Sequence, residues 1–211
     1  MKIPLVIQLS SVSPAAPIAA ALLARRRPRG ARTWVLAWCA WLLLEEGLQR
    51  WMAMHHTHNL WLVYWLDPVA SAAALWALSC WQGTDLARLT MRVAIVPLVA
   101  VLAAVSLFFE DTSFFSRATV PLANLVQLTA AAYTLVSRSR MSAQDIPTQD
   151  WFWVSAGMVL YFGTFSMIPP LSALLVGSDT ALLVRAYEFQ AVLTIAAFLA
   201  MARGMTCPAT T

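Results

Sequence analysis

The stretch LLLEEGLQRWMAMHHTHNLWLVYWLDP, residues 42–68, decides the fold of this chain and poses its functional question. Two glutamates, an arginine, three histidines and an aspartate stand there among leucines and tryptophans. Charges this dense are typical of a water-exposed surface, whereas the residues around them are typical of lipid-facing helices. Three interpretations are open: a catalytic or metal site inside a membrane, a ligand pocket, or the polar turn between two membrane spans.

The composition of the whole chain is that of an integral membrane protein. Of its 211 residues, 60% are hydrophobic and 11% are charged, and the mean hydropathy is +0.68. An average soluble domain has about 25% charged residues. Because a membrane-spanning helix needs about 20 apolar residues, the chain has room for about seven spans joined by short loops. We therefore expect an all-α, polytopic membrane protein with a single domain over residues 1–211.

Apolar runs and charged loops alternate along the chain, and together they predict a topology. Arginines gather in the loops at 25–32, 86–92 and 138–140 and at Arg203, whereas the intervening loops at 55–59, 110–117 and 177–180 hold one arginine among them. The positive-inside rule makes the arginine-rich side cytoplasmic, with the N-terminus outside and the C-terminus inside. The seven predicted helices are 4–24, 33–54, 60–82, 93–110, 118–137, 151–176 and 181–202. With Lys2 as the only lysine, the composition favours a bacterial inner membrane.

Adjacent prolines, Pro169 and Pro170, stand inside the sixth predicted helix. Each removes a backbone donor and crowds the preceding turn. We therefore expect this helix to break near its outer half.

Ionisable residues on three of the predicted helices fall at a similar depth in the outer leaflet. Glu46 and Arg50 are four residues apart in the second helix, and Arg185 and Glu188 are three apart in the seventh, so each pair shares a helix face. Asp67 in the third helix has no partner of opposite charge in its own helix. Because lipid penalises unpaired charges, we expect all five side chains to converge inside the bundle.

Aromatic side chains surround the mouth of this predicted charged layer. Most of them fit the interfacial belt of a membrane protein. A subset facing inward would form a ligand pocket with apolar walls and a few polar anchors. The predicted ligand-binding residues are Glu46, Arg50, Tyr64, Asp67, Tyr161, Arg185 and Glu188.

The sequence predicts no cofactor. Three histidines, His55, His56 and His58, are acceptable metal ligands. Neighbouring imidazoles in a short turn point in divergent directions, however, and no helix-spaced HxxxH is present, so we expect no bound metal. Covalent retinal, which seven-helix rhodopsins hold on a lysine of the last helix, is excluded because no lysine follows Lys2. No basic stripe with interleaved aromatics points to nucleic acid.

Two segments, HNLWLVYWLDP at 58–68 and DWFWVSAGMVLYFGTFSM at 150–167, resemble a loosely defined group of small bacterial seven-helix membrane proteins of about this length. The resemblance spans most of the chain. It implies a sensor or partner-binding module and little chemistry.

Three functions remain open from the sequence. The leading interpretation is a non-enzymatic, receptor-like protein of the bacterial inner membrane that binds a small or lipid-like ligand, or a membrane-protein partner, in an outer-leaflet pocket. The second is an intramembrane enzyme acting on a lipid or isoprenoid, with Glu46, Asp67 and Glu188 as its acid and base groups and a metal as an optional component. The third is a proton-coupled transporter, because paired buried carboxylates also serve proton transfer.

Overall fold

The computed structural model describes residues 4–24, 28–111, 116–142, 145–175 and 180–208, with the backbone alone for 168–175 and 180–181. All regular structure in these ranges is helical, as the composition predicts. The elements are α1 (Leu5–Val12), α2 (Ala15–Leu23), α3 (Ala31–Met54), α4 (Trp61–Ser79), α5 (Asp85–Val93), α6 (Ile95–Phe108), α7 (Thr119–Met141), the short 3-10 helix η1 (Ile146–Thr148), α8 (Asp150–Leu175) and α9 (Thr180–Thr206).

Several of these helices have the length and apolar character of membrane spans. Among the described residues, four stretches qualify on their own, and the bent pair α1 and α2 makes a fifth if it is one span. The four are Trp61–Ser79, Asp85–Phe108, Thr119–Met141 and Leu182–Thr206. The chain therefore has the architecture of a multi-pass membrane protein with four to five candidate spans.

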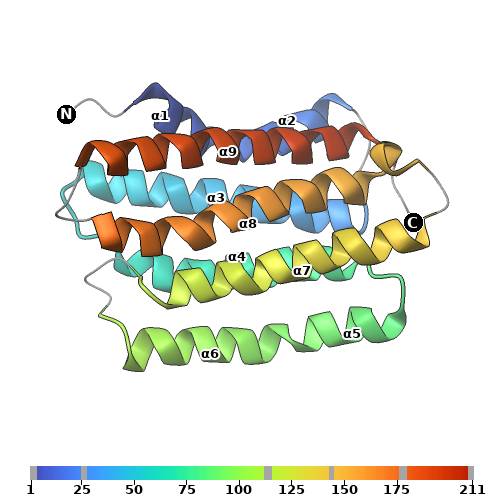
Figure 1. The fold of residues 1–211 in the computed structure, drawn as a ribbon, viewed down its shortest axis with the longest axis horizontal. Helices are drawn as coiled ribbons and strands as arrows, with labels where there is room; N and C mark the ends of the chain where they lie inside the picture. Colours follow the sequence, from blue (N-terminus) through green and yellow to red (C-terminus); the bar gives the residue numbers. More distant parts are fainter. Residues whose placement is uncertain (1–3, 25–27, 112–115, 143–144, 176–179, 209–211) are drawn as a thin grey trace.

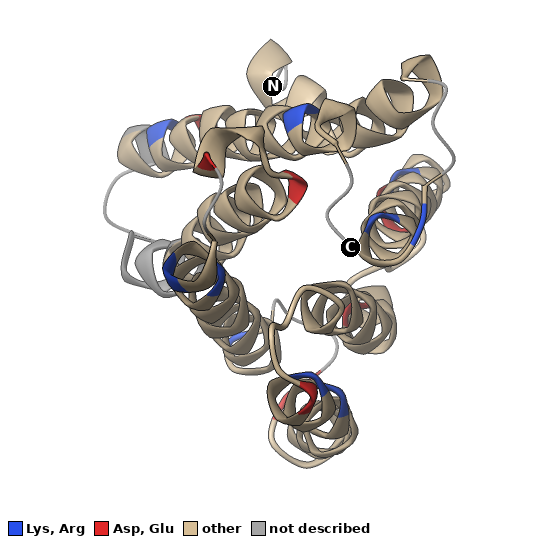
Figure 2. Cartoon of the chain, turned by 90° about the vertical axis from the view of Figure 1, so that its right-hand side faces the viewer, with Lys and Arg blue, Asp and Glu red and all other residues tan. Residues whose placement is uncertain are grey.

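The long helices run side by side along the long axis of the molecule (Figure 1). At one edge α9 lies against α1 and α2, the middle of the bundle holds α3 and α8, and α4 and α7 follow. The continuous stretch α5–α6 packs on α4 and α7 at the opposite edge. Figure 2 views the end where α3, α5 and α8 begin and α7 and α9 finish, and basic residues are visible on several helices there. Arg32, Arg88, Arg140 and Arg203 all belong to these helix ends.

Prolines shape the helices to different extents. The axis bends by 53° between α1 and α2, where Pro14 has no amide hydrogen to continue the first helix. Pro68 lies inside α4 without ending it. The predicted break at Pro169 and Pro170 is wrong, because α8 is one helix from Asp150 to Leu175. Proline is tolerated inside membrane helices when neighbouring groups and local adjustments satisfy the freed carbonyls.

The central core joins α3, α8 and α9 around Trp38. Its ring lies 5.6 Å from that of Phe162 on α8 and 5.9 Å from that of Phe198 on α9, measured between centroids. Glycines let α8 and α9 approach closely, since a Cβ atom at Gly157 would lie 2.6 Å from the carbonyl oxygen of Ala197. Small residues play this part in many membrane helix interfaces.

Polar side chains join α4, and the segment that directly follows it, to α7 inside the bundle. The side-chain amide of Gln127 donates to Ser71 Oγ at 2.8 Å, and that of Gln82 donates to Thr134 Oγ1 at 2.8 Å. Both bonds are buried, so each satisfies two groups that lipid would leave without partners.

Candidate functional site

Two hydrogen bonds fix the register between α3 and α4. Trp41 Nε1 donates to the carbonyl oxygen of Leu66 at 3.1 Å, and Asn59 Nδ2 donates to that of Gln49 at 3.0 Å. Residues 41, 45 and 49 share one face of α3, because positions four apart lie above one another on a helix. Glu45 therefore faces α4 and lies about 6 Å along the helix axis from the level of Trp41. Asp67 follows Leu66 directly, which brings the two carboxylates to the same helix interface.

Asp67 is half-buried, and one of its carboxylate oxygens is unsatisfied. Asp67 Oδ2 is inaccessible to solvent and has no hydrogen-bond partner among the described residues. Glu45 Oε1 accepts a hydrogen bond of 3.1 Å from Gln49 Nε2, and Glu45 is close enough to Asp67 for their charges to interact. Within the described part of the chain, no arginine forms an ion pair with either residue. Two interacting carboxylates thus lie in the bundle without a compensating cation.

Tyr161 of α8 completes this group. It lies within electrostatic reach of Glu45 and Asp67 and, more weakly, of Glu46. Its ring packs edge-on against Trp38 with centroids 5.5 Å apart, and against Phe165 at 4.6 Å. We call Glu45, Asp67 and Tyr161 the acidic site. Aromatic packing fixes one side of it, and the hydrogen bond from Trp41 to α4 fixes another.

The predicted pair Glu46 and Arg50 forms, but it lies away from the core. Arg50 Nε is 3.0 Å from Glu46 Oε1, with the two side chains 48% and 38% exposed. Arg50 also donates to Ser11 Oγ of α1. Because Glu45 and Glu46 point about 100° apart around α3, only one of them can face α4 squarely, and that residue is Glu45. The sequence prediction expected an arginine as the partner of Asp67, and the described residues show no such ion pair.

The remaining predicted partners do not join the acidic site as ion pairs. Arg185 is exposed and Glu188 is half-buried, and no ion pair links them in the part of the chain that the structure describes. The predicted convergence of five charges from three helices is therefore wrong. It assumed that equal depth implies contact, whereas contact also depends on how each helix is rotated about its axis. Tyr64 is buried and interacts with Ser116, in the connection between α6 and α7.

The three histidines lie exposed in the turn between α3 and α4. His55 Nδ1 is 2.8 Å from the carbonyl oxygen of Trp51, and the imidazole packs on the indole of Trp51 at 4.6 Å between centroids. His56 has a positive φ of 55°, which turns the chain sharply. Among the described residues, no group of three or more histidine, cysteine or acidic side chains is placed to hold a metal ion.

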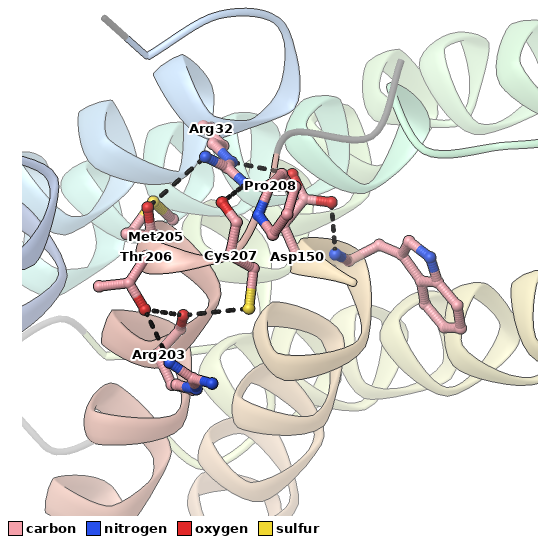
Figure 3. A network of polar contacts seen from close by, with 8 residues as sticks. Arg32, Asp150, Arg203, Met205, Thr206, Cys207 and Pro208 are labelled. Carbon is pink, nitrogen blue, oxygen red and sulfur yellow. Dashed lines mark hydrogen bonds and ion pairs between the residues drawn. The ribbon is translucent and has the colours of Figure 1, made fainter. Parts of the chain in front are cut away.

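A second buried polar group, at the opposite end of the bundle, is absent from the sequence prediction. Arg32 of α3 and Asp150 of α8 are only 5% and 1% exposed, and Arg32 Nε is 2.8 Å from Asp150 Oδ2 (Figure 3). Arg32 Nη2 also donates to the carbonyl oxygens of Cys207 and Pro208, both at 2.8 Å. We call these four residues the C-terminal clamp. It ties the starts of α3 and α8 to the segment that follows α9.

The clamp was missed because each member has an ordinary local explanation. Arg32 belongs to a run of arginines that is typical of a cytoplasmic loop, and Asp150 is typical of the acidic residues found in the first turn of a helix. In the structure the other oxygen of Asp150 does accept the amide of Trp151 at 2.8 Å. The sequence offered one signal for this contact. Arg32 and Asp150 stand at the starts of two predicted helices, and the predicted topology places both starts on the same side of the membrane.

Glu110 illustrates how this chain satisfies a structural carboxylate. It accepts hydrogen bonds from the amides of Arg117, Ala118 and Thr119, at 2.5, 2.7 and 3.0 Å, and so caps the start of α7. Partial burial alone raises the pKa of Glu110, but the hydrogen bonds from Thr119, Ala118 and Arg117 outweigh it and lower the pKa. Neither Asp150 nor Glu110 resembles Asp67, whose Oδ2 lacks any partner.

Comparison of the chain with models of protein families, with curated proteins and with solved structures gives no match.

Proposed function

We propose that this protein is a receptor-like membrane protein that binds a small or lipid-like ligand at the acidic site. The observation that carries the proposal is the buried Asp67 oxygen without a hydrogen-bond partner, beside a second carboxylate and with no cation paired to either among the described residues. An unpaired intramembrane carboxylate costs several kcal/mol, so such residues usually serve a function.

The other acidic groups of the same chain support this proposal. Asp150 has an arginine, and Glu110 has three backbone amides. Where a carboxylate holds the fold together, this sequence supplies its partners. Asp67 lacks them, which is what a site completed by an occupant requires.

The topology that accompanies this function has seven crossings of a bacterial inner membrane. The first span is the bent pair α1–α2, and the others are α3, α4, α5–α6, α7, α8 and α9. The N-terminus is outside, and the arginine-rich end of the bundle is cytoplasmic. The gathering of Arg32, Arg88, Arg140 and Arg203 at one end of the bundle supports this orientation. A membrane-protein partner would carry ligand occupancy further into the cell.

Unfolding of matched variants tests whether Asp67 is functional. Residues kept for function often reduce stability, so replacing them can stabilise the fold. We expect Asp67→Asn to raise the unfolding temperature of the purified protein, whereas Asp150→Asn lowers it. A loss of stability in Asp67→Asn comparable to that in Asp150→Asn would mean that Asp67 is structural, and the proposal would fail.

Native mass spectrometry supplies the second measurement. Protein purified gently from its own membranes should retain a small bound mass that is absent from Glu45→Gln/Asp67→Asn. The matched control is Asp85→Asn, which changes an exposed carboxylate at the start of α5, at the other end of the bundle, and should keep the bound mass. Equal spectra for all three proteins would contradict ligand binding at this site.

The transporter alternative depends on the same unpaired carboxylate, since a proton can occupy it in place of a ligand. Proteoliposomes given a pH gradient distinguish the two, because a transporter would dissipate the gradient through wild-type protein and not through Asp67→Asn. The enzyme alternative has less support. Of its three acidic residues, Glu46 pairs with Arg50, and Glu188 has no recorded interaction with Asp67 in the described structure.

A further inference from the structure

We infer that the ligand of the acidic site is an organic cation, a quaternary or protonated amine. This inference rests on the proposed function, because it names the chemistry of the ligand that the acidic site would bind. It follows from two separate properties of the site: the sign of its charge and the aromatic character of its surroundings.

The charge of the site calls for a cation. Glu45 and Asp67 interact with each other, and Asp67 Oδ2 has no donor. The arginine nearest in sequence, Arg50, is engaged by Glu46 and by Ser11. An anionic ligand would add like-charge repulsion in a medium of low dielectric constant, and a neutral apolar ligand would leave the carboxylates without compensation. A single positive charge compensates one carboxylate, and a proton shared by the pair neutralises the other.

The surroundings favour an organic cation over a metal ion. Hard metal ions such as Ca²⁺ take six to eight oxygen ligands, and Mg²⁺ takes six in a strict octahedron. The described residues include no group of three or more candidate metal-binding side chains. Alkylammonium ions instead bind over aromatic faces, within about 6 Å of a ring centroid, and acidic groups add to that attraction.

Aromatic side chains adjoin both carboxylates. Tyr161 lies within electrostatic reach of both, and its ring is held in place by Trp38 and Phe165. Trp41 is one turn from Glu45, and its indole N–H is already used by the carbonyl oxygen of Leu66. The chain uses the same chemistry elsewhere, where the guanidinium of Arg92 lies 4.5 Å from the ring centre of Trp76.

Binding of ammonium probes of different size tests this inference. The probes are tetramethylammonium, benzyltrimethylammonium and dodecyltrimethylammonium, added to protein in a nonionic detergent. Binding is followed by tryptophan fluorescence and by the rise in unfolding temperature. The control ligands are neopentylbenzene, which has the shape of benzyltrimethylammonium without its charge, and benzenesulfonate, which is an anion. We expect at least one cation to bind saturably and neither control ligand to bind.

Variants assign the binding to the acidic site. We expect Asp67→Asn and Glu45→Gln each to weaken cation binding at least tenfold, and Tyr161→Leu to weaken it while Tyr161→Phe, which keeps the ring, retains it. Asp85→Asn, which changes an exposed carboxylate at the other end of the bundle, is the matched control and should bind as wild type does. Binding by the dodecyl probe alone would identify a lipid-like amine, and binding by the two smaller probes would identify a free one.

Two results would overturn the inference, and both differ from failure of the proposed function. Saturable binding of neopentylbenzene as tight as that of benzyltrimethylammonium, or failure of all three cations to bind, would show that the ligand is not an organic cation. If Asp67→Asn still raises the unfolding temperature in that case, the acidic site remains a functional site for another occupant. If Asp67→Asn lowers it, the site is structural and both proposals fail.

Discussion

Breaking the C-terminal clamp should be among the most damaging polar changes in this protein. Arg32 and Asp150 are almost fully buried and 2.8 Å apart, and Arg32 additionally supplies donors to two backbone carbonyls at 2.8 Å. Removing one partner of a buried ion pair costs about 3–5 kcal/mol, because the other charge is left uncompensated. Arg32→Gln should reach the upper part of that range, since it also removes the donors for Cys207 and Pro208. Asp150→Asn should cost less, because an amide oxygen still accepts from Arg32.

The double variant Arg32→Gln/Asp150→Asn separates the interaction from the residues themselves. It leaves no buried charge without a partner, so its loss of stability should be smaller than the sum of the two single losses by about 1–3 kcal/mol. Unfolding would be followed by tryptophan fluorescence in a nonionic detergent. The matched control is Arg50→Gln, which breaks a half-exposed ion pair and should cost no more than about 1 kcal/mol.

Labelling of Cys207 provides a local measurement of the same clamp. Burial raises the pKa of the Cys207 thiol, which the nearby Arg203 and Arg32 lower to a smaller extent, so little of the reactive thiolate is present at neutral pH. Arg32→Gln removes one of the groups that lower this pKa, but it also releases the segment in which Cys207 is buried, and burial is the larger effect. In a background of Cys39→Ser and Cys80→Ser, Arg32→Gln should therefore speed labelling of Cys207 through greater exposure, and Arg50→Gln should not. If Arg32→Gln costs no more stability than Arg50→Gln and leaves labelling unchanged, the reasoning from burial and geometry is refuted.

Three further predictions concern packing, pH and topology. Gly157→Ala places a Cβ atom 2.6 Å from the carbonyl oxygen of Ala197 and should cost about 1–3 kcal/mol, whereas Gly47→Ala meets no atom within 4 Å and should gain about 0.5–1 kcal/mol; equal unfolding temperatures would contradict this. The lowered pKa of Glu110 means that its stabilisation is complete above the unfolded-state value of about 4.3 and is lost as the pH falls through the folded-state pKa. The drop in unfolding temperature between pH 6 and pH 3 should therefore be smaller in Glu110→Gln, and an identical drop would argue against the cap. A fluorescent-protein fusion at the C-terminus should be bright and an alkaline phosphatase fusion inactive, and the opposite pattern would reverse the proposed orientation.

Much of the fold and a part of the candidate site were predictable from the sequence. The helical class and the positions of most helices follow from the apolar runs. In lipid, such runs must satisfy their backbone hydrogen bonds internally, so they form helices whichever neighbours they pack against. Asp67 was also predictable as a residue that needs an explanation, because its own helix offers it no cation. The ion pair between Glu46 and Arg50 formed as expected, since positions four apart on a helix are neighbours in any fold. These features depend only on residues close together in the chain.

Tertiary structure alone decided the contacts between helices. The rotation of α3 puts Glu45, and not Glu46, against α4 beside Asp67, and a turn of about 100° per residue separates those two outcomes without changing the hydropathy pattern. Arg32 meets Asp150 across 118 positions of sequence, a contact that depends on how α3, α8 and the segment after α9 come together. Pro169 and Pro170 remain within a continuous α8, which the local cost of proline did not predict. Local sequence determines what each helix is, whereas the rotation and packing of the helices determine which charges are paired and which remain unpaired.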